Sequence, residues 1–319
     1  MKLLLTGGTG FFGRALLRSW IRDELCGVTV PEVTILTRSP ISFVERYPEF
    51  SSKSWLTLHE SNILNYKSLP VDDFFTHILH AATESTIGPS LSALQRYNEI
   101  VDGTRNILDY AVKNNVKRIL LTSSGGVYGP QPATMSKIPE SYLGIPDPLD
   151  PMSAYSIGKR AAEHLCSLYN QHFGLESVIA RCFSFAGKDL PLNAHFAIGN
   201  FIYDALHSDE ITITGNGTPI RSYMDQADLA SWLMCILDKG IAGHAYNVGS
   251  DKGIKISELA YLVRDILSPN KSVVFMDTAT TFQGRNIYIP DIRLAKSELN
   301  LDVKISLNKS IAQFAMWPF

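Results

Sequence analysis

Tyr155 and Lys159 stand four residues apart in the stretch Y-S-I-G-K. On a helix this spacing places both side chains on one face, so the ammonium group can lie beside the phenol. A neighbouring positive charge favours the phenolate and lowers the pKa of a tyrosine from about 10 toward working pH. We therefore predict that Tyr155 exchanges a proton at a sugar or alcohol carbon, assisted by Lys159. The same spacing also occurs by chance in many helices, so the pair needs support from other residues.

Hydroxyl side chains end an apolar segment that precedes this pair. The segment R-I-L-L-T-S-S, residues 118–124, has the composition of a buried strand. Ligands of open α/β sheets bind outside the carboxyl ends of the strands, so Ser124 should face the same crevice as Tyr155. We predict that Ser124 hydrogen-bonds to the oxygen atom at which Tyr155 acts.

A glycine-rich stretch, G-G-T-G-F-F-G, lies between the first apolar run and the first helical pattern. Gly7, Gly10 and Gly13 allow the backbone to turn tightly and to approach a pyrophosphate. The helix that follows supplies main-chain amides, at Phe11 and Phe12, and the positive end of its dipole. We predict that these five residues bind a dinucleotide; the alternative is a tight turn that merely needs glycine.

Arg38 follows the second predicted strand, in V-T-I-L-T-R-S-P. A carboxylate at this point binds the ribose 2′-hydroxyl of NAD, whereas an arginine can pair with the 2′-phosphate of NADP. Thr37 and Ser39 could add neutral hydrogen bonds. The sequence therefore favours NADP, with NAD as the alternative, unless Arg38 is simply a solvated arginine of a surface loop.

Strand-like and helix-like segments alternate through the first half of the chain, which predicts an α/β fold. We expect a Rossmann-like, doubly wound parallel sheet with a smaller α+β substrate-binding domain. The domains are placed at 1–174 and 175–319, with part of 225–250 returning to the first. The predicted strands are 2–5, 32–36, 56–59, 76–81 and 118–122, and the predicted helices are 12–25, 97–114 and 154–173.

Composition excludes several classes of protein. With a net charge of -2 and a pI near 6.4, the chain has no basic excess for binding nucleic acid. No apolar run approaches the roughly 18 residues that span a bilayer, so we expect a cytoplasmic protein with no membrane partner. The four cysteines are widely separated, which predicts buried free thiols and no metal site.

These motifs together resemble the extended short-chain dehydrogenase/reductase family of nucleotide-sugar epimerases, dehydratases and reductases. The resemblance adds H-A-A at 80–82, N-E-I-V-D-G-T-R-N-I-L from 98 and T-S-S-G-G-V-Y-G from 122. It continues through R-C-F-S-F-A-G at 181–187, I-T-G-N-G-T-P-I-R-S-Y at 213–223, A-Y-N-V-G at 245–249 and G-R-N-I-Y-I-P-D at 284–291. It therefore covers the whole chain.

The resemblance implies roles for particular residues. Ser124, Tyr155 and Lys159 would form the catalytic triad, and Tyr155 and Lys159 would also contact the cofactor, Lys159 at the nicotinamide ribose. A nucleotide-sugar substrate is implied, as is a homodimer formed through the helices 97–114 and 154–173. Further cofactor contacts are expected at Asn62, Ala81 and Ala82. Substrate contacts are expected at Ser124, Ser184, His195, Arg221 and Arg285, the two arginines holding the diphosphate; a surface-loop role fits His195 equally well.

Departures from the family pattern reduce the number of reactions that we expect this chain to catalyse. Gly125 and Gly126 stand where 4,6-dehydratases carry an Asp-Glu pair, and glycine cannot transfer a proton. Thr37 stands where members that retain NAD usually carry Asp, and Ser184 where epimerases commonly have Asn. We therefore expect an NADPH-dependent 4-keto reductase acting at C4 of a nucleotide-activated hexose. The alternative is a 4-epimerase with retained NAD; a 4,6-dehydratase or a non-catalytic NADP-binding protein fits the sequence less well.

Overall fold

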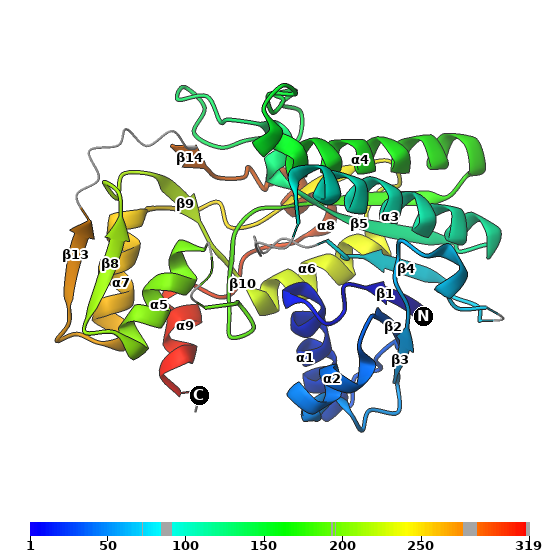
Figure 1. Cartoon of the computed structure of the whole chain (residues 1–319), viewed down its shortest axis with the longest axis horizontal. Coiled ribbons are helices and arrows are strands. Elements are labelled where there is room, and N and C mark those ends of the chain that lie inside the picture. The colour runs from blue at the N-terminus through cyan, green and yellow to red at the C-terminus, as the bar shows by residue number, and fades with distance from the viewer. Residues whose placement is uncertain (72, 84–90, 193, 195, 277–285, 317–319) are drawn as a thin grey trace.

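Parallel strands form a seven-stranded sheet in the order β11-β6-β5-β4-β1-β2-β3. The structure is a computed structural model that describes residues 1–71, 73–83, 91–192, 194, 196–276 and 286–316. The strands of this large sheet are β1 (Lys2–Thr6), β2 (Glu32–Thr37), β3 (Leu56–Glu60), β4 (His77–His80), β5 (Arg118–Ser124), β6 (Glu176–Cys182) and β11 (Ala245–Val248). The predicted Rossmann-like, doubly wound α/β fold is confirmed (Figure 1).

Helices cover both faces of the large sheet because its strands are apolar on both sides. Leu3 and Leu5 of β1 pack on one side and Leu4 on the other, as the alternation of side chains along a strand requires. The first face is covered by α1 (Phe11–Leu25), α6 (Gln226–Lys239) and α8 (Arg293–Leu299), and the second by α3 (Ala93–Lys113) and α4 (Ala154–Phe173). Figure 1 shows α3 and α4 side by side above the sheet.

The start of one helix differs from the prediction, and one further helix is present. Helix α3 begins at Ala93 rather than at 97, because Ser92 and Gln95 form a capping box ahead of the apolar pattern. A short helix, α2 (Pro40–Arg46), follows β2 where a loop was expected. Its first residue is Pro40. Proline is favoured at the first position of a helix, because a main-chain N–H at that position would have no acceptor within the helix. Helix α4 spans the predicted residues 154–173 and is followed by Gly174 in the left-handed conformation.

A smaller body is built from the later part of the chain and lies at the left of Figure 1. Its helices are α5 (Ala197–His207), α7 (Ile256–Leu267) and α9 (Leu307–Ala312), which share one apolar core. Its strands pair as β8 (Glu210–Thr214) with β13 (Ser272–Met276) and as β7 (Phe185–Ala186) with β10 (Met224–Asp225). In a third group, β9 (Ile220–Ser222) lies between β12 (Gly253–Lys255) and β14 (Ile287–Tyr288) and pairs with both.

The large sheet draws on both sides of the predicted boundary at 174. Strand β6 begins at Glu176 and pairs with β5, and β11 pairs with β6 in turn. Helix α6 packs against α1 through the core of the first face. The division into two domains therefore stays a prediction. Strands β6 and β11 belong to the large sheet and α6 covers it, although all three lie beyond residue 174.

Two further observations bear on expectations from composition. Among the described helices, none is long and apolar enough to cross a membrane. Cys166 and Cys182 are buried, but Cys26 is exposed, so the prediction of buried thiols is wrong for that residue. Cys26 follows the last turn of α1, where the chain leaves the core.

Candidate functional site

The glycine turn links β1 to α1 by a backbone path that excludes side chains. Gly7 has φ +71°, and a Cβ atom there would lie 2.4 Å from the carbonyl oxygen of Ala81. A Cβ atom at Gly13 would lie 2.1 Å from the carbonyl oxygen of Gly8. Helix α1 then begins without a side-chain cap from any described residue and without an acidic residue in its first turn. Its free amides and positive dipole end can accept a pyrophosphate, as predicted.

The side chains of Phe11 and Phe12 pack against another aromatic ring of the protein. Their rings lie 6.3 and 5.3 Å from the ring of Phe185 and help to join α1 to β7. Any contact of these two residues with a cofactor would therefore come from their main-chain amides at the start of α1.

Asp189 and the side chains bound to it, here called the Asp189 anchor, hold the glycine turn from the side. Arg14 donates to the carbonyl oxygen of Thr9 (2.7 Å) and to Asp189 Oδ1 (3.2 Å). Arg18 and Gln226 donate to Asp189 Oδ2 at 2.8 and 2.9 Å. Burial opposes ionisation of Asp189, but the hydrogen bond from Arg18 and the charges of both arginines hold its pKa below the ordinary value. The anchor joins α1 to the segment after β7 and to α6.

The other predicted cofactor residues follow neighbouring strand ends. Register pairs Thr6 of β1 with Leu36 of β2 and with His80 of β4. Ala81 and Ala82 donate their main-chain N–H groups to Thr6, at its carbonyl oxygen (3.2 Å) and Oγ1 (3.0 Å).

The ends of β2 and β3 carry two exposed members of the predicted set. Thr37 is buried and its Oγ1 accepts the N–H of Ser39 (3.3 Å), whereas Arg38 is exposed. Asn62, just beyond β3, is also exposed, and its Oδ1 accepts the N–H of Leu64 (3.0 Å). The predicted cofactor residues therefore gather at the carboxyl edge of the sheet.

Ser124 and Tyr155 are brought together as predicted. Ser124 ends β5, and Tyr155 lies in the first turn of α4, close enough for the Ser124 hydroxyl to act on the pKa of the phenol. Ser124 Oγ also accepts the N–H of Gly126 (3.0 Å), which fixes the start of the short helix η3 (Gly125–Tyr128).

The predicted lowering of the Tyr155 pKa is wrong in this structure. Burial raises the pKa of Tyr155 above its ordinary value, and the nearby hydroxyl of Ser124 and the charge of Arg96 oppose this only in part. A sequence does not display the burial of a particular phenol, so the expectation rested on the lysine alone.

Lys159 lies one helical turn beyond Tyr155 and is 3 % exposed. Its ammonium group donates to the carbonyl oxygen of Thr122 (2.7 Å) and to Thr83 Oγ1 (2.7 Å). It lies 6.0 Å from the centre of the Tyr155 ring. Burial lowers the pKa of Lys159 to about 8. Lys159 is therefore directed at the ends of β4 and β5 as well as at the phenol.

Tyr288 is a residue of this site that sequence reasoning missed. A Cβ atom at Gly125 would lie 2.5 Å from the hydroxyl oxygen of Tyr288 and 2.7 Å from the ring of Phe183. Tyr288 also lies close enough to Tyr155 to raise its pKa. The sequence signal that could have found Tyr288 is its place in G-R-N-I-Y-I-P-D, the segment at 284–291 that resembles the family. Gly125 is thus covered by two aromatic rings, and no larger residue fits there without displacing them.

The predicted substrate residues are placed in part. Ser184 is half-buried between β6 and β7, and its carbonyl oxygen accepts the N–H of Met224 (3.0 Å). Arg221 lies in β9, where register pairs it with Tyr288 of β14. His195 and Arg285 lie outside the described residues.

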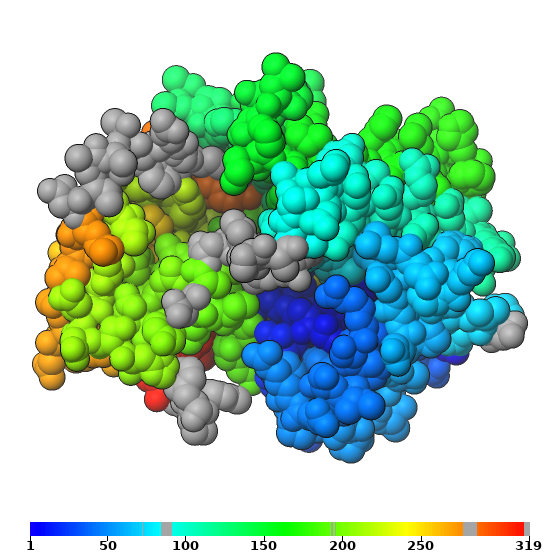
Figure 2. Space-filling model, viewed as in Figure 1, coloured from blue at the N-terminus to red at the C-terminus, as the bar shows by residue number. Residues whose placement is uncertain are grey.

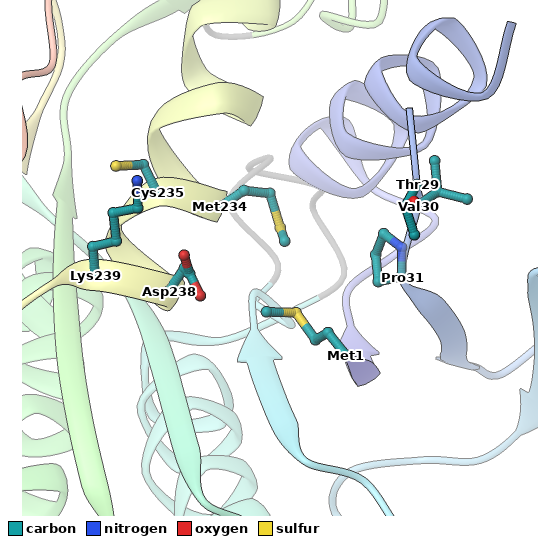
Figure 3. A pocket seen from close by; sticks show the side chains of 8 residues that line it. All are labelled: Met1, Thr29, Val30, Pro31, Met234, Cys235, Asp238 and Lys239. Carbon is teal, nitrogen blue, oxygen red and sulfur yellow. The ribbon is translucent and has the colours of Figure 1, made fainter. Parts of the chain in front are cut away.

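Pockets in the structure do not by themselves locate this chemistry. One of about 410 Å³ lies between the loop that precedes β2 and the end of α6 (Figure 3). Its lining residues are Met1, Thr29, Val30, Pro31, Met234, Cys235, Asp238 and Lys239, at the amino ends of β1 and β2. The hydroxyls of Ser124 and Tyr155 lie at the opposite, carboxyl edge. Figure 2 shows the N-terminal segment, in dark blue, set back in a hollow between the light blue and green parts of the surface.

Comparison with curated proteins finds relatives along nearly the whole chain. UDP-glucuronic acid decarboxylase 1 of Arabidopsis thaliana is 29% identical over 312 residues, which cover 98% of this chain and 68% of the relative. UDP-glucuronic acid decarboxylase 1 of Danio rerio is 28% identical over 325 residues, which cover 98% of this chain and 72% of that protein.

Solved structures agree with the fold. The X-ray structure of Pal from Bacillus thuringiensis matches with a TM-score of 0.84 and 25% identity, covering 99% of this chain and 98% of the other. UDP-glucose 4-epimerase of Thermotoga maritima, solved with UDP-glucose, matches with a TM-score of 0.82 and 21% identity over 99% and 98% of the two chains. At that identity the second match supports the fold alone.

A family model matches residues 3–249, a span that includes the glycine turn and the residues Ser124, Tyr155 and Lys159. The model describes the NAD dependent epimerase/dehydratase family. This span exceeds half of the chain and contains every strand of the large sheet. The chain therefore belongs to the NAD dependent epimerase/dehydratase family, whose members include enzymes that act on nucleotide sugars.

Proposed function

We propose that this protein transfers hydride between a nicotinamide dinucleotide and C4 of a nucleotide-activated hexose, and that the net reaction is NADPH-dependent reduction of a 4-keto sugar. The observation that carries the proposal is the approach of the Ser124 hydroxyl to the Tyr155 phenol, with Lys159 one turn further along α4. Two hydroxyls that converge at a strand end can bind one carbonyl oxygen from two directions.

The state of Tyr155 supports the reductive direction. Because burial raises its pKa, the phenol carries its proton at neutral pH and can donate it to the oxygen that develops at C4. Ser124 would donate a hydrogen bond to the same oxygen and polarise the ketone. The dinucleotide, when bound, supplies the hydride. It would be held by the amides that follow the glycine turn, by Lys159 and by Arg38.

The end of β2 supports NADPH as the reductant. Arg38 is exposed there, and no carboxylate stands at 37–39 to repel a 2′-phosphate. A guanidinium group can form two parallel hydrogen bonds with a phosphate, which a neutral 2′-hydroxyl cannot match.

Gly125 argues against dehydration. Removal of water from the sugar needs an acid and a base next to the catalytic serine. Tyr288 and Phe183 occupy the space that a carboxylic side chain at position 125 would need. The covered glycine therefore leaves redox chemistry at C4 as the reaction that these residues support.

The second candidate is a redox-neutral conversion with retained NAD, such as 4-epimerisation or decarboxylation of a nucleotide-linked uronic acid. Similarity to UDP-glucuronic acid decarboxylases over 98% of the chain favours it. Such an enzyme would oxidise C4 and later return the hydride from the same cofactor. It would therefore consume no reductant.

The test begins with the purified protein, from which bound nucleotide is released by denaturation and identified. Refolded or nucleotide-free protein is then titrated with NADPH and NADH. Single turnovers follow with NADPH deuterated at C4 of the nicotinamide and a panel of 4-keto-hexose nucleotides. We expect selective, reversible NADPH binding and one deuterium at C4 of the product.

Two variants test whether the preference for NADPH depends on Arg38 at the end of β2. Arg38→Asp should weaken NADPH binding at least tenfold and favour NADH, while Arg22→Asp, at an exposed position on α1, should leave the preference unchanged. Tightly retained NAD, or a clear preference of the native protein for NADH, would contradict net reduction and favour the second candidate. Loss of turnover in Tyr155→Phe with cofactor binding intact would exclude a non-catalytic role.

A further inference from the structure

Lys159 is a buried cation that bridges the ends of two neighbouring strands. One N–H of its ammonium group is donated to the carbonyl oxygen of Thr122 on β5, and another to Thr83 Oγ1 just beyond β4, both at 2.7 Å. Removing an ammonium group from water costs several kcal/mol unless its donors are satisfied. Each of these two acceptors therefore contributes to keeping the buried group charged.

Thr83 is held so that it accepts from Lys159 rather than donates. Its own hydroxyl proton goes to the carbonyl oxygen of Ala82 (2.8 Å). A hydroxyl has one proton and two lone pairs, so with the proton engaged a lone pair is presented to the ammonium group. The ammonium group has three protons, and Thr83 and Thr122 take two of them. This geometry fixes the direction of the third.

The other groups that face Lys159 do not replace this acceptor. The charge of Glu163, one turn along α4, and the thiols of Cys182 on β6 and Cys166 on α4 act on its pKa from a distance. His80 on β4 is buried and neutral at working pH, because burial and the charge of Lys159 lower its pKa to about 3. Its ring nitrogens are engaged by Thr6 (2.7 Å) and Thr104 (3.2 Å). The phenol of Tyr155 lies beside the lysine with its own pKa raised.

We propose that Thr83 is a positioning residue, which fixes the ammonium group of Lys159 between the ends of β4 and β5 and leaves its third N–H for a hydroxyl of the bound dinucleotide. The contact with the dinucleotide rests on the proposed function. The placement of Lys159 by Thr83 rests on the two hydrogen bonds alone.

The consequence is a pH dependence that a purely structural threonine would not have. Burial already lowers the pKa of Lys159 to about 8. Removing a hydrogen bond to the charged form lowers it further, by about one pH unit for a bond of ordinary strength to a charged group. Dinucleotide binding that needs the charged lysine would then be lost at correspondingly lower pH.

The experiment compares Thr83→Val, which keeps the shape but lacks the hydroxyl, with Thr83→Ser, which keeps the hydroxyl. Thr57→Val, at an exposed position of β3, is the matched control. Side-chain nitrogen NMR of lysine-labelled protein follows the titration of Lys159, whose signal is identified by its absence in Lys159→Arg. Affinity for NADPH is measured by fluorescence over the same pH range. If Thr83→Val does not fold, Thr83→Ala takes its place.

We expect the titration midpoint of Lys159 to fall by about one pH unit in Thr83→Val and to stay at the native value in Thr83→Ser and Thr57→Val. An unchanged midpoint in folded Thr83→Val, or an equal shift in Thr83→Ser, would overturn the proposal. The alkaline limit of NADPH binding should move with the midpoint, and failure to move would overturn the link to the dinucleotide. The NMR result is independent of turnover, so it stands even if the protein reduces no nucleotide sugar.

Discussion

Replacing Asp189 by asparagine should destabilise the protein far more than the loss of one charge at the surface. The carboxylate has a side chain that is 3% exposed and is paired with Arg14, at 12% exposed, and Arg18, at 20%. Asparagine keeps the shape but removes the charge. Arg18 would retain Glu49 (2.9 Å), whereas Arg14 would retain only uncharged acceptors such as the carbonyl oxygen of Thr9.

The magnitude follows from burial. Breaking a buried ion pair by removing one partner costs about 3–5 kcal/mol, because the remaining charge stays buried without compensation. The matched control is Asp251→Asn. Asp251 pairs with Lys137 at a similar distance, 2.8 Å, but the two side chains are 26% and 40% exposed. An exposed pair of this kind contributes less than about 1 kcal/mol.

The assay is urea unfolding at pH 7, with the midpoint and the slope compared among the native protein and the two variants. NADPH affinity is measured in parallel, because the Asp189 anchor also holds the carbonyl group of Thr9 in the glycine turn. We expect Asp189→Asn to lower the midpoint strongly and to weaken NADPH binding, and Asp251→Asn to do neither. Equal midpoints for the two variants would refute the reasoning.

The pH dependence of the same pair has a definite sign. The folded-state pKa of Asp189 is below its ordinary value of 3.8. Its contribution to stability is therefore complete above about pH 4 and is lost as the pH falls through the folded-state pKa. The difference between native protein and Asp189→Asn should be full at pH 7 and narrow below pH 4.

Three further predictions follow from the site. Tyr155→Phe should abolish turnover while NADPH affinity, measured by fluorescence, stays within a few-fold of native. Gly13→Ala should weaken NADPH binding at least tenfold, because its Cβ atom would lie 2.1 Å from the main-chain oxygen of Gly8; unaltered affinity would contradict the tight turn. His80 has its pKa lowered to about 3, so stability should fall by up to about 1.4 kcal/mol per pH unit below pH 6.5. Urea unfolding between pH 7 and 5 should show this slope in native protein and a smaller one in His80→Gln.

Periodicity and turn chemistry were enough to predict the parallel sheet, five of its seven strands and the placement of its carboxyl edge, but not β6 and β11. Strand positions follow from short apolar runs, and the glycines of the turn follow from their place between a strand and a helix. The start of α3 was not predicted, because the capping box at Ser92 lies ahead of the apolar pattern. Local polar hydrogen bonds of this kind leave only a weak trace in a sequence.

The approach of Ser124 to Tyr155 could be predicted because each residue is placed by a local rule, one at a strand end and one on a helix face. Tyr288 and Thr83 could not, because their contacts with Gly125 and Lys159 join parts of the chain that are remote in sequence. The pKa of Tyr155 was predicted in the wrong direction for the same reason. Burial is a property of the packed molecule, and no neighbour in the sequence discloses it.

Helix α1 packs against α6, and this contact sets the order in which the protein can fold. The apolar face of α1, with Leu16 and Trp20, is covered by Trp232 and its neighbours on α6. Residues 26–225 separate the two helices, and synthesis at about 5–20 residues per second takes about 10–40 s to produce them. During that time α1 can pack only on earlier parts of the sheet, as Trp20 does against Trp55, and the part of its face that meets α6 stays uncovered. The contact between α1 and α6 is therefore completed late in biosynthesis, and until then the nascent chain exposes an apolar surface of the kind that chaperones bind.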